Sequence, residues 1–140
     1  MKALDRLRVA IAIVALVGVG IAAYLTSVHY AHTAPICTSG GCEKVQRSSY
    51  AELYGIPVAV LGLVAYVLLL AAVAWHGANA ALAGAFVALT GAAFSAYLLW
   101  AQLARIHAIC VWCVGNDVVM ATLAVLCSVR FLREPEVVTP

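Results

Sequence analysis

The sequence predicts an all-α integral membrane protein, a four-helix bundle with a short capping helix in its first outer loop. Hydrophobic residues make up 66% of the 140-residue chain and charged residues only 10%, and the mean hydropathy is +1.05. A soluble domain carries roughly 25% charged residues, so this composition excludes an ordinary soluble enzyme and a disordered tail. The formal net charge of +2 is too small for a nucleic-acid-binding surface. Most of the surface is therefore expected to face a lipid bilayer.

Charged residues are absent from two long stretches of the chain, 9–28 and 56–104. A helix needs about 20 apolar residues to cross a hydrocarbon core of ~30 Å. The polar, turn-forming stretch 76–79 divides the longer of the two into two spans, and a further span precedes the C-terminus. The length fits one domain, residues 1–140. The predicted spans lie at about 9–28, 56–75, 81–103 and 109–129.

The first span has one alternative, a cleaved signal peptide, because basic residues precede it. Its apolar run is longer than the core of a signal peptide, which has about 7–15 residues, so we expect a retained helix. Four spans place both termini on one side of the membrane. Basic residues are more numerous on that side, so the positive-inside rule predicts cytoplasmic termini and a multi-pass protein of the cell (inner) membrane. The basic residues on the side of the termini are Lys2, Arg6, Arg8, Arg130 and Arg133. Those on the other side are Lys44, Arg47 and Arg105.

Four of the five cysteines are predicted to lie on the periplasmic or extracellular side of the membrane. Cys37 and Cys42 follow the first span, and Cys110 and Cys113 open the fourth. Thiols that face an oxidising compartment form disulfides and keep them. Cys127 lies about four turns deeper in the fourth span, where a small apolar filler is the expected role.

The stretch 110–113 reads Cys-Val-Trp-Cys, a CxxC motif at the start of a helix. The free N–H groups and the dipole of a helix N-terminus stabilise a thiolate, which is the species that exchanges disulfides. Small and flexible residues separate Cys37 from Cys42, which suits a mobile, reducible disulfide. One alternative is a structural disulfide beside an inert CxxC. Another is a four-thiolate zinc or iron–sulfur site, which the oxidising compartment disfavours, so we expect no metal.

The sequence after the first cysteine pair predicts the short capping helix. The stretch 49–52 reads Ser-Tyr-Ala-Glu and matches the capping box S-x-x-E, with Ser49 as the cap. This helix would lie across the outer mouth of the bundle. Gly55 would end it, and Pro57 would start the second span at a tolerated first-turn position.

Three stretches of the sequence carry the pattern of a known family. They are the spacing Cys37-x4-Cys42, the stretch 45–51 running into 55–59, and the CxxC at 110–113. Together they resemble the prokaryotic homologues of vitamin K epoxide reductase, over residues 9–129 or nearly the whole chain. The resemblance implies a four-helix bundle around a quinone, capped by a short helix on the outer side.

The resemblance also implies roles for individual residues. Cys113 would be the thiol next to the quinone. Cys110 would be its partner, able to pair with Cys42 during the relay of electrons. Cys37 would exchange with the substrate protein. Ser48 matches the family's serine near the quinone carbonyl.

Two polar positions of the animal members differ in this chain. The asparagine near the start of their second helix falls at Pro57-Val58, and the tyrosine one turn past their CxxC falls at Asp117. The resemblance therefore does not extend to these contacts with the quinone or to activity on vitamin K epoxide. Some prokaryotic members carry a fused thioredoxin-like domain. This chain ends at Pro140, so the expected partner is a separate thioredoxin-like (DsbA-like) protein.

Asp117 is the one acid within a predicted span. Its spacing from Cys110 and Cys113 places all three on one helix face. An intramembrane acid is a functional candidate by default, so we expect Asp117 to face the quinone pocket, where it handles protons or holds the head group. The alternative is an interfacial residue that snorkels to water, since it lies only about one turn below Cys113.

Disulfide formation releases two electrons and two protons, which need an acceptor. No G-x-G-x-x-G follows a strand and no C-x-x-C-H is present, so the sequence shows no signal for nicotinamide, flavin or haem. A membrane quinone (menaquinone, ubiquinone or a related one) is the simplest acceptor. We therefore expect a quinone-dependent thiol/disulfide oxidoreductase. The alternatives are a DsbB-type disulfide generator, whose CxxC lies in the first outer loop, a non-enzymatic membrane scaffold with structural disulfides, and a metal-binding transporter.

Overall fold

The computed structural model describes residues 2–31, 36, 41, 44–45 and 47–133. Within these residues the chain is mainly helical, as the sequence predicted. The four long helices are α1 (Lys2–Ala31), α3 (Val58–Ala74), α4 (Ala78–Ala101) and α5 (Val111–Arg133). Compared with the predicted spans, α1 extends further at both ends, α3 is shorter at both ends, and α5 begins and ends later.

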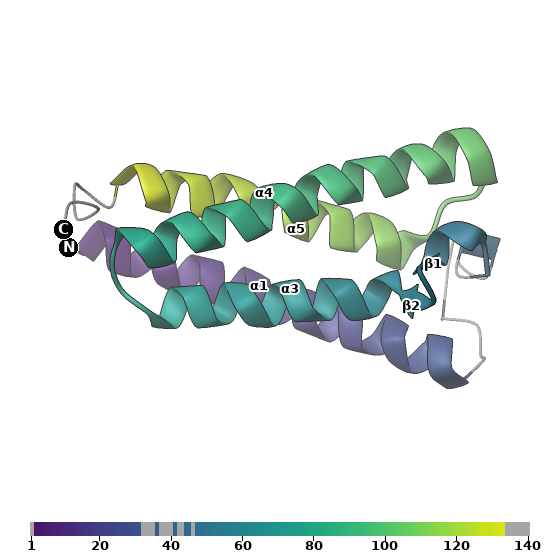
Figure 1. The fold of residues 1–140 in the computed structure, drawn as a ribbon, viewed down its shortest axis with the longest axis horizontal. Coiled ribbons are helices and arrows are strands. Elements are labelled where there is room, and N and C mark those ends of the chain that lie inside the picture. The colour runs from purple at the N-terminus through teal and green to yellow at the C-terminus, as the bar shows by residue number, and fades with distance from the viewer. Residues whose placement is uncertain (1, 32–35, 37–40, 42–43, 46, 134–140) are drawn as a thin grey trace.

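The four helices lie side by side and alternate in direction (Figure 1). α1 packs against α3 and α5, and α4 packs against α5 and α3. The start of α1, the end of α5 and the α3–α4 turn share one end of the molecule, called here the terminal end. The opposite end, called the hairpin end, holds the start of α5 and the strands β1 (Glu52–Leu53) and β2 (Ile56–Pro57). Buried core residues come from all four helices and include Ile11, Ala15, Tyr66, Leu69, Ala88 and Leu123.

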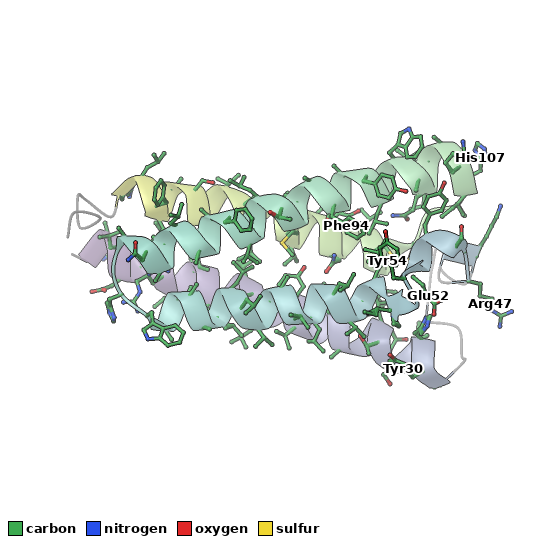
Figure 2. All side chains as sticks on the ribbon, in the orientation of Figure 1. Tyr30, Arg47, Glu52, Tyr54, Phe94 and His107 are labelled. Carbon is green, nitrogen blue, oxygen red and sulfur yellow. The ribbon has the colours of Figure 1, made fainter. Side chains whose placement is uncertain are left out.

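Three of the described helices are long and apolar enough to cross a membrane, namely α1, α4 with the turn that follows it, and α5. α3 is apolar but has only 17 residues, or about 26 Å at 1.5 Å per residue. Apolar side chains also cover the outward surfaces of the helices, whereas Arg47, Glu52 and His107 lie at the hairpin end (Figure 2). More than half of the surface is exposed on Val9, Leu16, Val67, Phe86 and Val125. Helices that are apolar on every side are typical of membrane spans.

Two arginines cap the end of α3 at the terminal end. Arg130 of α5 donates its Nη1 to the Ala72 carbonyl and its Nη2 to the Trp75 carbonyl, both at 2.9 Å. Arg8 of α1 donates its Nε and Nη2 to the Val73 carbonyl at 3.2 and 2.6 Å. The last carbonyls of a helix lack partners within it and favour a nearby cation. The two guanidinium groups therefore stabilise the C-terminal end of α3.

The connection before α3 differs from the predicted capping helix. Residues 49–51 form a single 3-10 turn, and the β1–β2 hairpin follows directly. Tyr54 and Gly55 form its two-residue turn with φ angles of 53° and 81°, the left-handed values that a tight hairpin requires. Ser48 holds the cap position of the 3-10 turn and makes no side-chain cap bond. The cap expected at Ser49 and the helix end expected at Gly55 are therefore wrong, because only the 3-10 turn at 49–51 is helical here and the hairpin takes the rest of the predicted segment.

Candidate functional site

The CxxC motif lies at the hairpin end, where α5 begins. Cys110 directly precedes α5, and its carbonyl accepts the Val114 N–H at 2.9 Å, which closes the first turn. Its Sγ accepts the Cys113 N–H at 3.4 Å, as the side chain of an N-cap residue does. The helix dipole favours negative charge at this position. Cys110 is fully buried, whereas Cys113 is partly exposed.

A buried glutamine holds the residue that begins the motif. α4 runs into a turn of π geometry, η2 (Gln102–Ile106). The Gln102 Oε1 accepts the Cys110 N–H at 2.9 Å, and the Gln102 carbonyl accepts the Ala108 N–H at 3.2 Å. The side chain thus satisfies a buried N–H that would otherwise lack a partner. The sequence reasoning missed Gln102, although a polar residue at the end of an apolar span was a signal for it.

Two aromatic side chains hold Ile36, the residue before Cys37. The Tyr24 hydroxyl accepts the Ile36 N–H at 3.0 Å. The Trp112 Nε1 of the CxxC motif donates to the Ile36 carbonyl at 2.5 Å. The Tyr24 and Trp112 rings also pack together, with centroids 4.6 Å apart. Both backbone polar groups of Ile36 are therefore bonded, one to a side chain of α1 and the other to a side chain in the first turn of α5.

Gly41, the residue before Cys42, lies against the same region. A Cβ atom built on Gly41 would lie 2.5 Å from the Ile109 carbonyl oxygen, so no larger residue fits there without a shift of the backbone. Val45 is buried in a cluster with Cys110, and its N–H bonds to the Gly41 carbonyl at 3.1 Å. Gly41 and Val45, on either side of Cys42 in the sequence, therefore both lie against the residues that lead into α5.

The loop cysteines predicted to act as a pair, Cys37 and Cys42, lie outside the described residues. Their chain neighbours Ile36 and Gly41 are described, and both contact the start of α5 or the residues just before it. The roles predicted for the two loop cysteines remain predictions.

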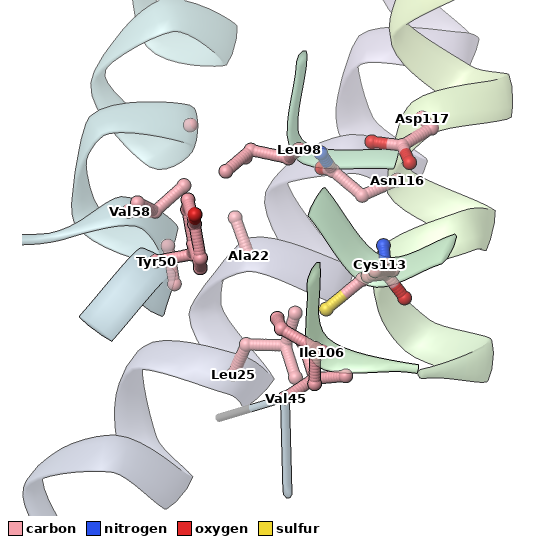
Figure 3. Close-up of a pocket in the computed structure, with 13 residues that line it drawn as sticks. Ala22, Leu25, Val45, Tyr50, Val58, Leu98, Ile106, Cys113, Asn116 and Asp117 are labelled. Carbon is pink, nitrogen blue, oxygen red and sulfur yellow. The ribbon is translucent and has the colours of Figure 1, made fainter. Parts of the chain in front are cut away.

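Cys113 lines a cavity at the hairpin end whose empty volume, including the space open to its surroundings, is about 620 Å³ (Figure 3). The Cys113 sulfur and the Asn116 side chain extend from α5 towards the space that Tyr50 and Val58 face from the other side. Most of the wall is apolar, and its apolar residues include Ala22, Leu25, Val58, Leu98 and Ile106.

The two polar residues predicted to lie near the quinone, Asp117 and Ser48, occupy different positions relative to the cavity. Asp117 lines the cavity, and its carboxyl interacts with the Ser95 hydroxyl of α4. Its Oδ2 is buried and has no hydrogen-bond partner among the described residues. Ser48 is not part of the lining. Its Oγ donates to the carbonyl of Val45 at 2.7 Å, and Val45 does line the cavity.

The cavity has a second polar side chain that the sequence reasoning missed, Asn116. The buried Tyr66 of α3 donates its hydroxyl to the Asn116 Oδ1 at 2.6 Å. Asn116 lies one turn after Cys113, so the two side chains share a helix face. The signal for it was an amide next to Asp117 within an apolar span.

An apolar groove between α3 and α4 adjoins the cavity. Its empty volume, including the space open to its surroundings, is about 980 Å³. The groove and the cavity share four lining residues, which are Val58, Gly62, Leu98 and Asn116. The remaining groove residues are mostly apolar and include Leu61, Leu68, Phe86 and Met120. An apolar ligand could therefore extend from the Cys113 cavity to the outer surface of the helices.

The other chemistry-bearing residues of the described part form no additional site. Among the described residues, no group of three or more His, Cys, Asp and Glu side chains could hold a metal ion. Cys37 and Cys42 lie outside that search. Cys127 is 3% exposed within the core, which is consistent with its predicted role as an apolar filler.

A comparison with known protein families gives one match that covers most of the chain. The model of the vitamin K epoxide reductase family matches residues 9–128 of the 140 residues. The matched region contains both cysteine pairs, the whole cavity lining and most of α1 and α5. The chain therefore belongs to the vitamin K epoxide reductase family, whose members are thiol–disulfide oxidoreductases of the membrane.

Proposed function

We propose that this protein passes electrons from an extracytoplasmic thioredoxin-like protein to a membrane quinone and so generates protein disulfides. One observation carries the proposal. The second cysteine of the CxxC lines a mostly apolar cavity, and two of the polar side chains of that cavity, Asn116 and Asp117, come from the following turn of the same helix. A thiol in such a wall is positioned to react with a small ligand inside the bundle.

The cavity and the groove match the two chemical parts of a quinone. A quinone head group needs hydrogen-bond donors for its carbonyl oxygens, and Asn116, together with Asp117 when its carboxyl is protonated, offers these beside Cys113. An isoprenoid tail needs an apolar channel, which the groove between α3 and α4 provides. Ligand pockets commonly combine an apolar wall with a few well-placed polar groups. Menaquinone, ubiquinone and related quinones share these features.

The cysteines would act in a relay of thiol–disulfide exchange. A thiolate of the reduced partner attacks the Cys37–Cys42 disulfide at Cys37, and the partner leaves oxidised when its second thiol displaces Cys37. Cys42 then attacks Cys110 of the Cys110–Cys113 disulfide, which forms a Cys42–Cys110 disulfide and releases Cys113. Cys37 attacks Cys42 in turn, which reforms the Cys37–Cys42 disulfide and releases Cys110 as a thiol. The contacts of Ile36 and Gly41 with the region where α5 begins support a short path between the pairs.

The last step of each cycle reforms the Cys110–Cys113 disulfide. This reaction removes two electrons and two protons from the two thiols. A quinone, when bound, would supply the acceptor for both and so become a quinol. Asp117 is the one carboxyl group of the cavity lining, so it is the group placed to receive or pass a proton there. The N–H contact to the Cys110 sulfur would stabilise that sulfur as a thiolate during exchange.

The proposed orientation places both termini in the cytoplasm and the hairpin end outside. The two ends can be distinguished with single cysteines in a background without the native ones. Ser49→Cys is exposed at the hairpin end, and Asn79→Cys is exposed at the terminal end. An impermeant maleimide should label the first in intact cells and the second only after the membrane is opened. The reverse pattern would overturn the orientation.

Reconstitution tests the proposed function. The purified protein in lipid nanodiscs is mixed without oxygen with a reduced thioredoxin-like protein and a short-tail quinone, and quinone absorbance is followed. We expect one quinone to be reduced for each disulfide formed in the partner. A membrane scaffold with structural disulfides would show no turnover with any quinone, and its cysteine-to-serine variants would lose stability instead.

A further inference from the structure

The hydroxyl of Tyr66 fixes the orientation of the Asn116 amide. Tyr66 is 0% exposed, and its hydroxyl lies 2.6 Å from the Asn116 Oδ1 and 3.4 Å from the Asn116 carbonyl oxygen. Both oxygens are acceptors, so the hydroxyl is the donor in this contact. The ring is held as well, because a Cβ atom on Gly18 of α1 would collide with it.

This contact leaves the nitrogen of the Asn116 amide as a donor without a partner. An amide has one oxygen that accepts and an NH2 group that donates two hydrogens. The oxygen is bonded to Tyr66, and within the described part of the chain the nitrogen forms no hydrogen bond. Asn116 lines the cavity one turn after Cys113, and Figure 3 shows its side chain extending towards the cavity. The cavity therefore offers an N–H donor of fixed orientation close to the thiol.

The other polar side chains of the lining have different positions or chemistry. The Gln102 Oε1 accepts the Cys110 N–H, which ties that amide to the start of α5. The Asp117 carboxyl interacts with Ser95, and an ionised carboxyl can only accept hydrogen bonds. Tyr50 lies on the opposite side of the cavity from α5. Asn116 is thus the fixed N–H donor on the same helix as Cys113.

We propose that Asn116 donates its amide N–H to a carbonyl oxygen of the quinone, and that Tyr66 is a positioning residue that keeps the amide turned for this bond. The proposal rests on the proposed function. A quinone carbonyl oxygen only accepts hydrogen bonds, and negative charge builds on it as electrons arrive from the thiol pair. A donor fixed in advance stabilises that charge without reorganising. The same donor selects ligands that present a carbonyl oxygen at this depth.

Three variants separate the parts of the proposal. Asn116→Leu keeps the approximate shape but removes the donor. Asn116→Asp keeps the acceptor for Tyr66 and removes the N–H group. Tyr66→Phe keeps the ring and frees the amide to rotate. Tyr97→Phe, on α4 and outside the cavity lining, is the matched control for loss of a tyrosine hydroxyl.

The test measures dithiol-driven reduction of short-tail ubiquinone and short-tail menaquinone in nanodiscs, together with the infrared carbonyl stretch of the bound quinone. We expect both Asn116 variants to lose about tenfold or more in kcat/KM. The bound carbonyl stretch should move to higher frequency as its hydrogen bond is lost. Tyr66→Phe should show a smaller loss and a broadened band, and Tyr97→Phe should match the wild type. A merely structural role would not move this band in a folded variant.

Two outcomes overturn the proposal in distinguishable ways. If the wild type reduces quinone and both Asn116 variants keep its rate and its carbonyl band, Asn116 does not bind the quinone, and the proposed function stands. If the wild type reduces neither quinone, the proposed function fails and this inference fails with it. Should Tyr66→Phe not fold, Asn116→Asp still decides the role of the N–H group, because it keeps the contact with Tyr66.

Discussion

The two ends of the bundle hold polar side chains in opposite ways. At the terminal end, Arg130 and Arg8 donate to the carbonyls that end α3. At the hairpin end, the Asp117 Oδ2 is buried without a hydrogen-bond partner among the described residues. The Asn116 amide nitrogen also has no hydrogen-bond partner among these residues. In the described part of the chain, the polar groups without a partner at the hairpin end line a cavity, whereas Arg8 and Arg130 are not among the residues that line the pocket at the terminal end.

This difference separates a structural use of polar groups from a chemical one. A buried polar group without a partner costs free energy, so its presence in a folded protein calls for an explanation such as a ligand. The arginines at the terminal end compensate for helix carbonyls and need no ligand. Substitutions at the terminal end should therefore lower stability with little effect on quinone reduction. Substitutions at the hairpin end should lower quinone reduction with little effect on stability.

The largest expected effect is at the thiol of the cavity wall. Cys113→Ala should lower dithiol-driven quinone reduction to the uncatalysed rate, because no other described cysteine lines the cavity. Cys127→Ala is the matched control, since it removes a buried thiol from the same helix. Anaerobic quinone absorbance measures both. Substantial activity in Cys113→Ala, or equal loss in Cys127→Ala, would contradict the assignment.

Asp117 is expected to have the next largest effect. Asp117→Asn keeps the shape of the side chain but removes its titration. Positioned acid–base groups typically contribute about 10²–10⁴-fold, so we expect a rate loss of that order or a changed pH profile of quinone reduction. Asp5→Asn removes an exposed acid at the terminal end and should leave the profile unchanged. An unchanged rate for Asp117→Asn from acid to neutral pH would favour the snorkelling interpretation.

Replacing Arg130 should lower the stability of the protein and leave its quinone reduction largely intact. Arg130→Met removes the donors to two carbonyls at the end of α3, and each unsatisfied carbonyl costs about 1–3 kcal/mol. We expect the free energy of unfolding to fall by about 2–6 kcal/mol, with quinone reduction by the folded protein preserved. Arg133→Met, at an exposed position of the same helix, is the control. A rate loss without a loss of stability would break the contrast between the ends.

The smallest effect is expected at the contact that holds Ile36. Trp112→Phe keeps an aromatic ring against Tyr24 but removes the N–H donor to the Ile36 carbonyl. A single hydrogen bond contributes about 0.5–1.5 kcal/mol. Turnover with the thioredoxin-like partner should therefore fall severalfold, while turnover with a small dithiol that reduces the inner pair directly should not. Trp100→Phe serves as control. Equal losses with both reductants would show that Trp112 acts elsewhere.

The sequence predicts the helices and the cysteine site better than it predicts the polar contacts. Hydropathy places the spans because a membrane helix is apolar throughout, and the CxxC is visible from its spacing alone. The Tyr66–Asn116 bond joins residues of two different helices, so it depends on how α3 and α5 pack, which spacing does not encode. The hairpin was missed because a capping-box match at Ser49 competed with the left-handed turn at Tyr54 and Gly55. Ser48 shows the same limit, since its hydroxyl bonds to a local carbonyl.

A single-turnover measurement tests the central claim most directly, because it needs no protein partner. Fully reduced protein is mixed without oxygen with an equimolar short-tail quinone, the absorbance is followed, and the products are digested and mapped by mass spectrometry. We predict that quinone is consumed in step with formation of a disulfide between Cys110 and Cys113, one for one. Disulfide formation without loss of quinone, or loss of quinone at an equal rate in the Cys113→Ala variant, would contradict a quinone site beside Cys113.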